Sequence, residues 1–292
     1  MKELRNEAVE LARRAGDVLV RAYQKRGGTV ASKSTIIDLV TDADRAAEEV
    51  IVEAIASRYP DHALLAEESG AAGRDGPFRW IIDPLDGTVN FAHRQPHFST
   101  LIAVQERTAS GGFETVVGVI FDPLRDEMFT ASRGDGATLN DVRLRVSVVG
   151  RLIDATAASG FAYDRLFNET DNHREFCRMN FLTQGVRRLG SAGLDLAYVA
   201  SGRIDFFWEY RLNPWDLAAG ALLVTEAGGT VSDMDGGRVD LDTGDVIASN
   251  CLLHDAGRAA LDAARRLPVG SRQGLEDHLP PEVVAKLHEG GG

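Results

Sequence analysis

The sequence predicts a mixed fold, α+β in its first half and closer to α/β in its second. Between residues 98 and 149, several β-rich segments follow one another closely with Gly or Pro-Asp turns between them, which favours an antiparallel sheet. After residue 150, strand-like and helix-like segments alternate, as they do in α/β folds. The 292 residues, of which 44% are hydrophobic, are enough for one large unit or for two closely joined halves.

Residues 1–266 are predicted to form that single unit, with a first half at about 1–150 and a second at about 151–266. The remaining residues, 267–292, contain three prolines and end in three glycines, so we expect a loosely held tail. The sequence has no internal repeat and no low-complexity linker.

Composition and charge argue against several classes of protein. Acidic residues outnumber basic ones by 44 to 32, the formal net charge is −12, and no Lys/Arg cluster stands out, so we expect no direct nucleic-acid partner. The N-terminal segment MKELRNEAVELARRAG lacks the apolar core of a signal peptide, and no apolar run approaches the roughly 18 residues of a spanning helix. Cys177 and Cys251 match no zinc or redox spacing. We therefore expect a cytoplasmic protein without a membrane partner.

Helical periodicity predicts two helices in the first half. In residues 3–25 apolar side chains recur at helical spacing, and a Gly-Gly pair ends the helix. A polar loop at 27–35 follows, and Thr41 or Asp42 can cap a second helix that continues to about Arg58. Strands are expected at 63–68, 80–82, 98–106, 114–122, 127–134 and 143–149, with a loop at 70–76.

In the second half, strands and helices alternate. The expected strands are 152–160, 185–189, 204–208 and 246–250. The expected helices are 171–181, 191–201, 214–226 and 255–266, and the proline at the start of the third is typical of a first helical turn.

The segment WIIDPLDGTVNF places two aspartates, Asp83 and Asp86, at the end of an apolar strand. The proline between them lacks an N–H and keeps Asp83 extended, so we expect the strand to stop there and the two carboxylates to converge with the Leu85 carbonyl. Gly87 permits a tight turn that points its own N–H and that of Thr88 at an anion. Clustered hard oxygen ligands suit Mg²⁺ or Ca²⁺. The alternative to a metal site is an Asp-rich turn in which the two aspartates only cap backbone N–H groups.

Further acidic residues occur where strands end and helices begin, which is where sites in α/β folds are built. Glu67 and Glu68 end a predicted strand. Asp216 lies in the first turn of a predicted helix, where a dipole-complementing role is the ordinary explanation. Asp44 lies at the start of the second helix, and the same explanation is available for it.

WIIDPLDGTVNF, taken together with AEES and PWDLAAGALLVTEAGG, resembles the inositol monophosphatase family. The resemblance runs from the first helix to about Arg266 and includes KSTIIDLVTDAD, GVIFDP and LGSAGLDLAYVASGRIDFFWE. It implies a five-layered αβαβα sandwich of the sugar-phosphatase type, usually a homodimer. It also implies a Mg²⁺-dependent, lithium-sensitive phosphatase.

The resemblance also implies roles for individual residues. Two to three Mg²⁺ ions would be held by Glu67, Asp83, the Leu85 carbonyl, Asp86 and Asp216. Thr88, supported by Asp44, and Glu67 would orient the attacking water. The substrate would be contacted by Asp86, Gly87, Thr88, Ala192, Glu209 and Asp216, with the N–H groups of Gly87 and Thr88 on phosphate and Ala192 and Glu209 on the alcohol. Lys33 lies in a loop that family members close over the site, and Glu68 would support the site without binding metal.

The resulting prediction is hydrolysis of a phosphate monoester, above all myo-inositol monophosphate, by water activated by metal and without a covalent intermediate. Fructose 1,6-bisphosphate, histidinol phosphate and 3′-phosphoadenosine nucleotides are alternative substrates on the same fold. DPLDGT differs in spacing from the DxDGT signature of phosphatases that form an aspartyl-phosphate. A regulatory protein that associates with the transcription machinery is an alternative of another class, and the intact set of predicted metal ligands gives no support to a loss of catalysis.

Overall fold

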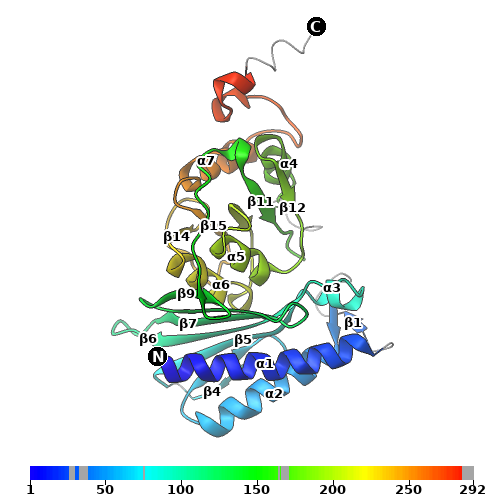
Figure 1. Ribbon diagram of the computed structural model, residues 1–292, viewed down its shortest axis with the longest axis vertical. Helices are drawn as coiled ribbons and strands as arrows, with labels where there is room; N and C mark the ends of the chain where they lie inside the picture. Colours follow the sequence, from blue (N-terminus) through cyan, green and yellow to red (C-terminus); the bar gives the residue numbers. More distant parts are fainter. Residues whose placement is uncertain (26–29, 33–38, 75, 164, 166–170, 285–292) are drawn as a thin grey trace.

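The computed structural model describes residues 1–25, 30–32, 39–74, 76–163, 165 and 171–284, and it has five layers (Figure 1). Helices α1 (Lys2–Gln24) and α2 (Asp42–Arg58) form one outer layer and cover an eight-stranded sheet. Helices α5 (Ala192–Ala200) and α6 (Pro214–Glu226) separate this sheet from a five-stranded one. The other outer layer is α4 (His173–Leu182) with α7 (His254–Arg265). The expected αβαβα sandwich is confirmed.

The eight-stranded sheet has the order β10-β9-β8-β7-β6-β5-β3-β4. All neighbours in it are antiparallel except β3 and β5, which are parallel. Its strands are β3 (Ala63–Ala66), β4 (Gly70–Gly73), β5 (Phe78–Asp86), β6 (Ser99–Arg107), β7 (Phe113–Asp122), β8 (Glu127–Ser132), β9 (Gly136–Leu139) and β10 (Val142–Arg143). The antiparallel sheet expected in the first half is therefore present. A separate hairpin pairs β1 (Val30–Ser32) with β2 (Leu39–Thr41).

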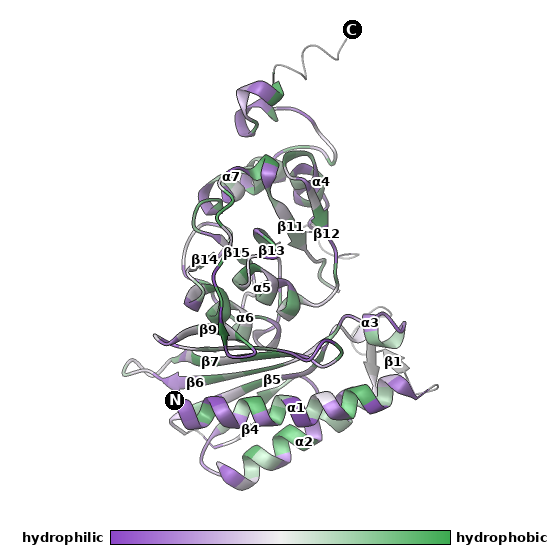
Figure 2. Ribbon diagram, viewed as in Figure 1, coloured by the Kyte–Doolittle hydropathy of each residue, from purple (hydrophilic) through white to green (hydrophobic). Residues whose placement is uncertain are grey.

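The central strands of this sheet are buried on both faces, which explains why their sequences are continuous apolar runs. In β5, Ile81 packs into the core shared with α5 and α6, whereas Trp80 and Ile82 pack into the core shared with α1 and α2. Helix α1 differs from these strands, because hydrophobic and hydrophilic residues alternate along its ribbon (Figure 2). An outer helix covers the sheet with one face only, so it keeps a polar face.

The five-stranded sheet has the order β12-β11-β13-β15-β14. Three neighbouring strands are parallel, β12 (Gly185–Arg187), β11 (Thr156–Ser159) and β13 (Phe206–Glu209). β15 (Val246–Asn250) runs antiparallel to β13 and to β14 (Gly229–Ser232). The sequence pattern did not predict β14.

The prediction of a strand at 143–149 was wrong. The chain instead forms a hairpin of β9 and β10, and residues 144–150 have no regular structure. Asn140 and Asp141 have φ values of 46° and 65°, the left-handed pair that a tight two-residue hairpin turn requires. Leu144 of the predicted strand is buried and Val146 packs against the same core, whereas Val148 is 88% exposed.

Three further expectations need correction. Residues 70–73 of the predicted loop pair with β3 as the edge strand β4. β5 does not stop at Asp83 but continues to Asp86, with an irregularity in its register between these two residues. Residues 273–275 of the segment after residue 267 are held to the body, because Leu275 is buried in the core around α4 and α7. Arg178 also donates hydrogen bonds to the carbonyls of residues 273 and 274 in that segment.

Candidate active site

The parallel pairing of β3 with β5 places two acidic residues side by side. Ala66 is opposite Ile82 in the register, and the N–H of Glu67 donates to the Ile82 carbonyl at 3.1 Å. The register therefore places Glu67, which directly follows β3, beside Asp83 of β5. Glu48 of α2 fixes the turn that follows, because its carboxylate oxygens each accept an N–H, from Glu68 and Ser69, at 2.8 Å.

The irregular end of β5 arranges the DPLDGT segment. Asp83 Oδ1 accepts the N–H of Leu85 at 2.9 Å, so the carboxylate turns back over its own chain. Gly87 then adopts a left-handed conformation with φ 93°. A Cβ at this residue would lie 3.1 Å from the His97 carbonyl oxygen and 3.2 Å from that of Gly190. Both the backbone angle and the close approach explain the glycine.

Asp44 and Thr88 are hydrogen-bonded at the buried centre of the site. Thr88 Oγ1 lies 3.1 Å from Asp44 Oδ1 and 3.0 Å from the Leu85 carbonyl oxygen. Asp44 also closes the N-terminal capping box of α2 by accepting the N–H of Thr41 at 2.9 Å. Burial raises the pKa of Asp44 to about 6, although the hydrogen bonds from Thr41 oppose this shift. The expected pairing of Thr88 with Asp44 is thus present in the structure.

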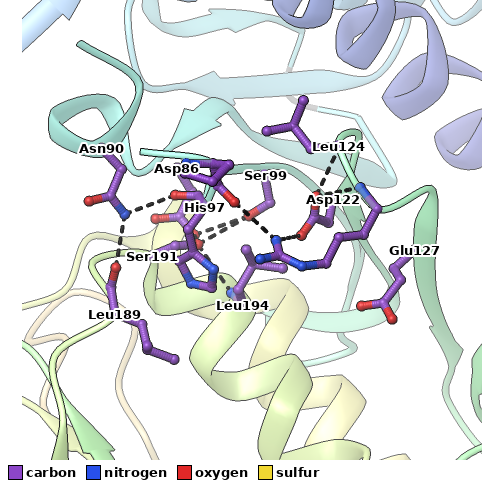
Figure 3. Close-up of polar contacts among 12 residues, drawn as sticks. Asp86, Asn90, His97, Ser99, Asp122, Leu124, Glu127, Leu189, Ser191 and Leu194 are labelled. Atoms are coloured by element: carbon purple, nitrogen blue, oxygen red, sulfur yellow. Dashed lines mark hydrogen bonds and ion pairs between the residues drawn. The ribbon is translucent and has the colours of Figure 1, made fainter. Parts of the chain in front are cut away.

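Asp86 joins the end of β5 to the start of α5 (Figure 3). Its Oδ2 accepts hydrogen bonds from Ser191 Oγ at 2.5 Å, from the N–H of Gly193 at 2.9 Å and from Ser99 Oγ at 3.2 Å. Its Oδ1 accepts the N–H of Ala192 at 3.2 Å. Burial raises the pKa of Asp86, and these four donors counteract the rise. The carboxylate therefore occupies the N-terminus of α5, where the helix dipole favours a negative charge.

Asp216 and Glu209 complete the acidic set from the second half of the chain. Asp216 closes the capping box of α6 and accepts the N–H of Asn213 at 2.8 Å. Glu209 is the last residue of β13, and burial raises its pKa to about 7. A Cβ at Gly160 would lie only 2.0 Å from Glu209 Oε1, so the glycine makes room for this carboxylate.

The acidic side chains raise one another's pKa values. Burial raises the pKa of Asp83 well above its ordinary range, and the carboxyl groups of Glu67, Asp86 and Asp216 add to the shift. The pKa of Asp216 is raised in the same way, first by burial and then by Glu67 and Asp86. Such mutual repulsion is relieved when a cation joins the groups.

The donor set fits a hard divalent cation, because every member is a carboxylate or a carbonyl oxygen. Among the described residues, however, no three His, Cys, Asp or Glu side chains are already grouped as a complete metal site.

A small pocket of about 80 Å³ opens beside these carboxylates. The predicted site residues that line it are Asp86, Gly87, Ala192, Glu209 and Asp216. Asp195 and Arg188 also line it, and the sequence analysis assigned neither a role. A larger groove of about 670 Å³ lies at the opposite ends of β5, β6 and β7. One of its acidic residues, Glu114, pairs with Arg133 and Arg238.

Sequence reasoning missed several residues that build the site. Glu48, Asn90, Asp195 and Gly160 make contacts over long sequence separations, and no local pattern marks them. Asn90 Nδ2, for example, donates to the carbonyls of His97 and Leu189, both at 2.8 Å (Figure 3). Residues 30–32 of the predicted loop at 27–35 form β1, and Lys33 lies outside the described residues.

Comparisons with known proteins agree on one family. The model of the inositol monophosphatase family matches residues 1–266. An inositol-1-monophosphatase of Synechocystis sp. is 49% identical over 227 residues, covering 77% of each chain. The Nus factor SuhB of Escherichia coli is 45% identical over 251 residues, covering 86% of this chain and 92% of that protein.

A solved structure shares the fold along almost the whole chain. The inositol monophosphatase from Anabaena (Nostoc) sp. superposes with a TM-score of 0.81 at 41% identity, covering 92% of this chain and 97% of that one. In the described part of the protein, no helix combines the length and the apolar character needed to cross a membrane. The extent of the family match and the level of identity show that this chain belongs to the inositol monophosphatase family.

Proposed function

We propose that the protein hydrolyses phosphate monoesters in a Mg²⁺-dependent reaction and that myo-inositol monophosphate is its preferred substrate. One observation carries this proposal. The carboxyl groups of Glu67, Asp86 and Asp216 lie close enough to buried Asp83 to raise its pKa, and Asp86 and Asp216 line a pocket. Family membership supports the reaction class.

In this proposal Mg²⁺ is held by Glu67, Asp83, the Leu85 carbonyl, Asp86 and Asp216. The chemistry that the bound metal supplies is neutralisation of the phosphate dianion, a lowered pKa of water and stabilisation of the leaving alkoxide.

The protein's own groups position and deprotonate the water. Thr88 Oγ1 lies within hydrogen-bond distance of Asp44 Oδ1, so it can pass a proton to that carboxylate while accepting one from the water. Glu67 would orient the same water. The water oxygen attacks phosphorus, the bond from phosphorus to the alcohol oxygen breaks, and the alcohol takes a proton from solvent.

The substrate would be bound from two sides. The N–H groups of Gly87 and Thr88 would hold the phosphate, and Asp86 and Asp216 would lie between phosphate and alcohol. Glu209 lines the pocket and would accept hydrogen bonds from hydroxyls of the alcohol. Ala192, whose N–H donates to Asp86, would contact the alcohol from the start of α5.

The proposal is tested by phosphate release from four esters: inositol 1-phosphate, fructose 1,6-bisphosphate, histidinol phosphate and adenosine 3′,5′-bisphosphate. Each is assayed with Mg²⁺ and with EDTA. We expect release that depends on Mg²⁺, is fastest with inositol 1-phosphate and is inhibited by lithium. Release that persists in EDTA would contradict the metal assignment, and faster release from another ester would replace the proposed substrate.

The names of several relatives support a second candidate function. Proteins called Nus factor SuhB are 44% to 46% identical to this chain. We therefore also propose an association with the transcription machinery, separate from catalysis. Co-elution of the purified protein with RNA polymerase in size-exclusion chromatography tests it, and separate elution would contradict it. The same column, with light scattering, tests the expected homodimer.

A further inference from the structure

Asp195 is a buried carboxylate that the mechanism above does not use. It lies in the first turn of α5, its residue is 2% exposed, and it lines the pocket beside the site. Its Oδ1 has no hydrogen-bond partner among the described residues. A buried polar atom without a partner costs about 1–3 kcal/mol, so such an atom at a pocket wall calls for an explanation.

Capping of α5 does not explain Asp195, because other groups already satisfy the N-terminus of this helix. Asp86 accepts the N–H groups of Ala192 and Gly193. The N-cap residue Ser191 accepts the N–H of Leu194 at 3.4 Å. Capping of the helix therefore does not occupy the carboxyl group of Asp195, a residue that lines the pocket.

The neighbours of Asp195 define the chemistry of the pocket wall. Burial raises its pKa well above the ordinary range, Glu209 and Asp86 add to the rise, and Arg188 opposes it. Arg188 is exposed, and its Nη1 lies 3.0 Å from where a Cβ of Gly190 would be, so this glycine leaves space for the guanidinium. Two carboxylates that accept hydrogen bonds and one guanidinium that donates them suit a ligand rich in hydroxyl groups.

Resting on the proposed function, we propose that Asp195 is a specificity-determining residue that accepts a hydrogen bond from a hydroxyl of the alcohol part of the substrate. Asp195 and Glu209 then bind different hydroxyls. The site consequently selects phosphate monoesters of polyhydroxy alcohols over esters without free hydroxyls.

The test compares inositol 1-phosphate with phenyl phosphate, which lacks free hydroxyls. Asp195→Ala is expected to lower kcat/KM for inositol 1-phosphate by about 10- to 100-fold, the effect of leaving a buried hydrogen-bonding group without its partner. Phenyl phosphate turnover is expected to fall much less. Asp195→Asn keeps one acceptor oxygen and similar volume, so a smaller loss is expected. Asp255→Ala is the control, because it removes an acid whose side chain is 96% exposed.

An equal loss on both esters, or no loss on either, would overturn the assignment of Asp195. If the wild-type protein releases phosphate from neither ester, the proposed function has failed. The role of Asp195 is then judged from saturation-transfer NMR with myo-inositol. A signal present in the wild type and in Asp255→Ala but lost in Asp195→Ala supports the assignment. An equal signal in all three proteins, or none in the wild type, overturns it.

Discussion

At the scale of single residues, the space left by glycine decides where the carboxylates of the site can lie. Glu209 is buried at the end of β13, and a side chain at Gly160 would overlap its carboxylate. Gly87 similarly allows the chain to turn directly after Asp86. The sequence predicted the turn at Gly87, but nothing near Gly160 indicates its role, because the carboxylate that needs the space comes from a distant part of the sequence.

The contact at Gly160 leads to a prediction about substrate preference. Gly160→Ala would place a Cβ 2.0 Å from Glu209 Oε1 and would displace this carboxylate. We expect kcat/KM for inositol 1-phosphate to fall by about tenfold, the effect of losing one such hydrogen bond, while phenyl phosphate is affected less. Gly150→Ala is the matched control, since its Cβ would meet nothing within 4 Å. Equal kinetics in the two variants would contradict the role given to Glu209.

The residues of the candidate site could be named from the sequence only where they belong to contiguous motifs. Asp83, Asp86 and Thr88 lie within one stretch, and Asp216 lies in another. Asp195, in contrast, looks like an ordinary first-turn acid until the structure shows that Asp86 and Ser191 already cap its helix. Its surroundings depend on tertiary contacts, which a single sequence does not encode in a local pattern.

At the scale of elements, helices were predicted more accurately than strands. The bounds of α6 agree with the prediction because a proline and an acidic first turn mark its start. The strand predicted at 143–149 failed although Leu144 and Val146 pack into a core, because the backbone pairing with β9 ends at Arg143. The actual hairpin depends on the left-handed turn at Asn140 and Asp141, a signal that apolar periodicity does not contain.

The junction of α7 with the five-stranded sheet predicts a pH dependence of stability. His254, the first residue of α7, has both ring nitrogens 2.9 Å from serine hydroxyls, those of Ser232 and Ser249. Burial lowers its pKa, Arg258 lowers it further and Asp255 opposes them. The unfolded chain therefore takes up a proton at higher pH than the folded one. Stability from this residue is complete above the ordinary histidine pKa of about 6.5 and is lost as pH falls below it.

We expect His254→Asn to lose less stability than the wild type between about pH 7.5 and pH 5.5, because the variant lacks this proton uptake. The measurement is the free energy of unfolding in urea at both pH values. Other histidines with lowered pKa values, such as His97, are present in both proteins and cancel in the comparison. A wild type and variant with the same pH dependence would contradict this account.

At the scale of the whole molecule, the site is assembled from both halves of the chain. β3, β5 and α2 supply Glu67, Asp83 and Asp44 from the first half, whereas β13 and α6 supply Glu209 and Asp216 from the second. The layered arrangement followed from resemblance to a family, not from periodicity, which located most elements but not their order in the sheets. That order depends on pairings such as β3 with β5, which neither strand's own sequence specifies.

The C-terminal segment adds to the hydrophobic core beyond the end of α7. Leu275 is buried in the core around α4 and α7, contrary to the loose tail expected from composition. We expect Leu275→Ala to lower the free energy of unfolding by about 2–5 kcal/mol, as for other buried leucines. Val269→Ala is the control, because Val269 is 56% exposed in the same segment. Equal stability of the two variants would show that the segment does not contribute to the core.

The central claim is that buried carboxylates hold the metal that hydrolysis requires, and Asp83→Asn tests it most directly. Asparagine keeps the oxygen that accepts the Leu85 N–H. It cannot carry the negative charge that the neighbouring carboxylates repel. The variant should therefore melt at the same or a higher temperature than the wild type in EDTA, which would show that it is folded. The measurement is phosphate release from inositol 1-phosphate across a Mg²⁺ titration. We expect the folded variant to release no phosphate at any Mg²⁺ concentration, and turnover close to that of the wild type would contradict the claim.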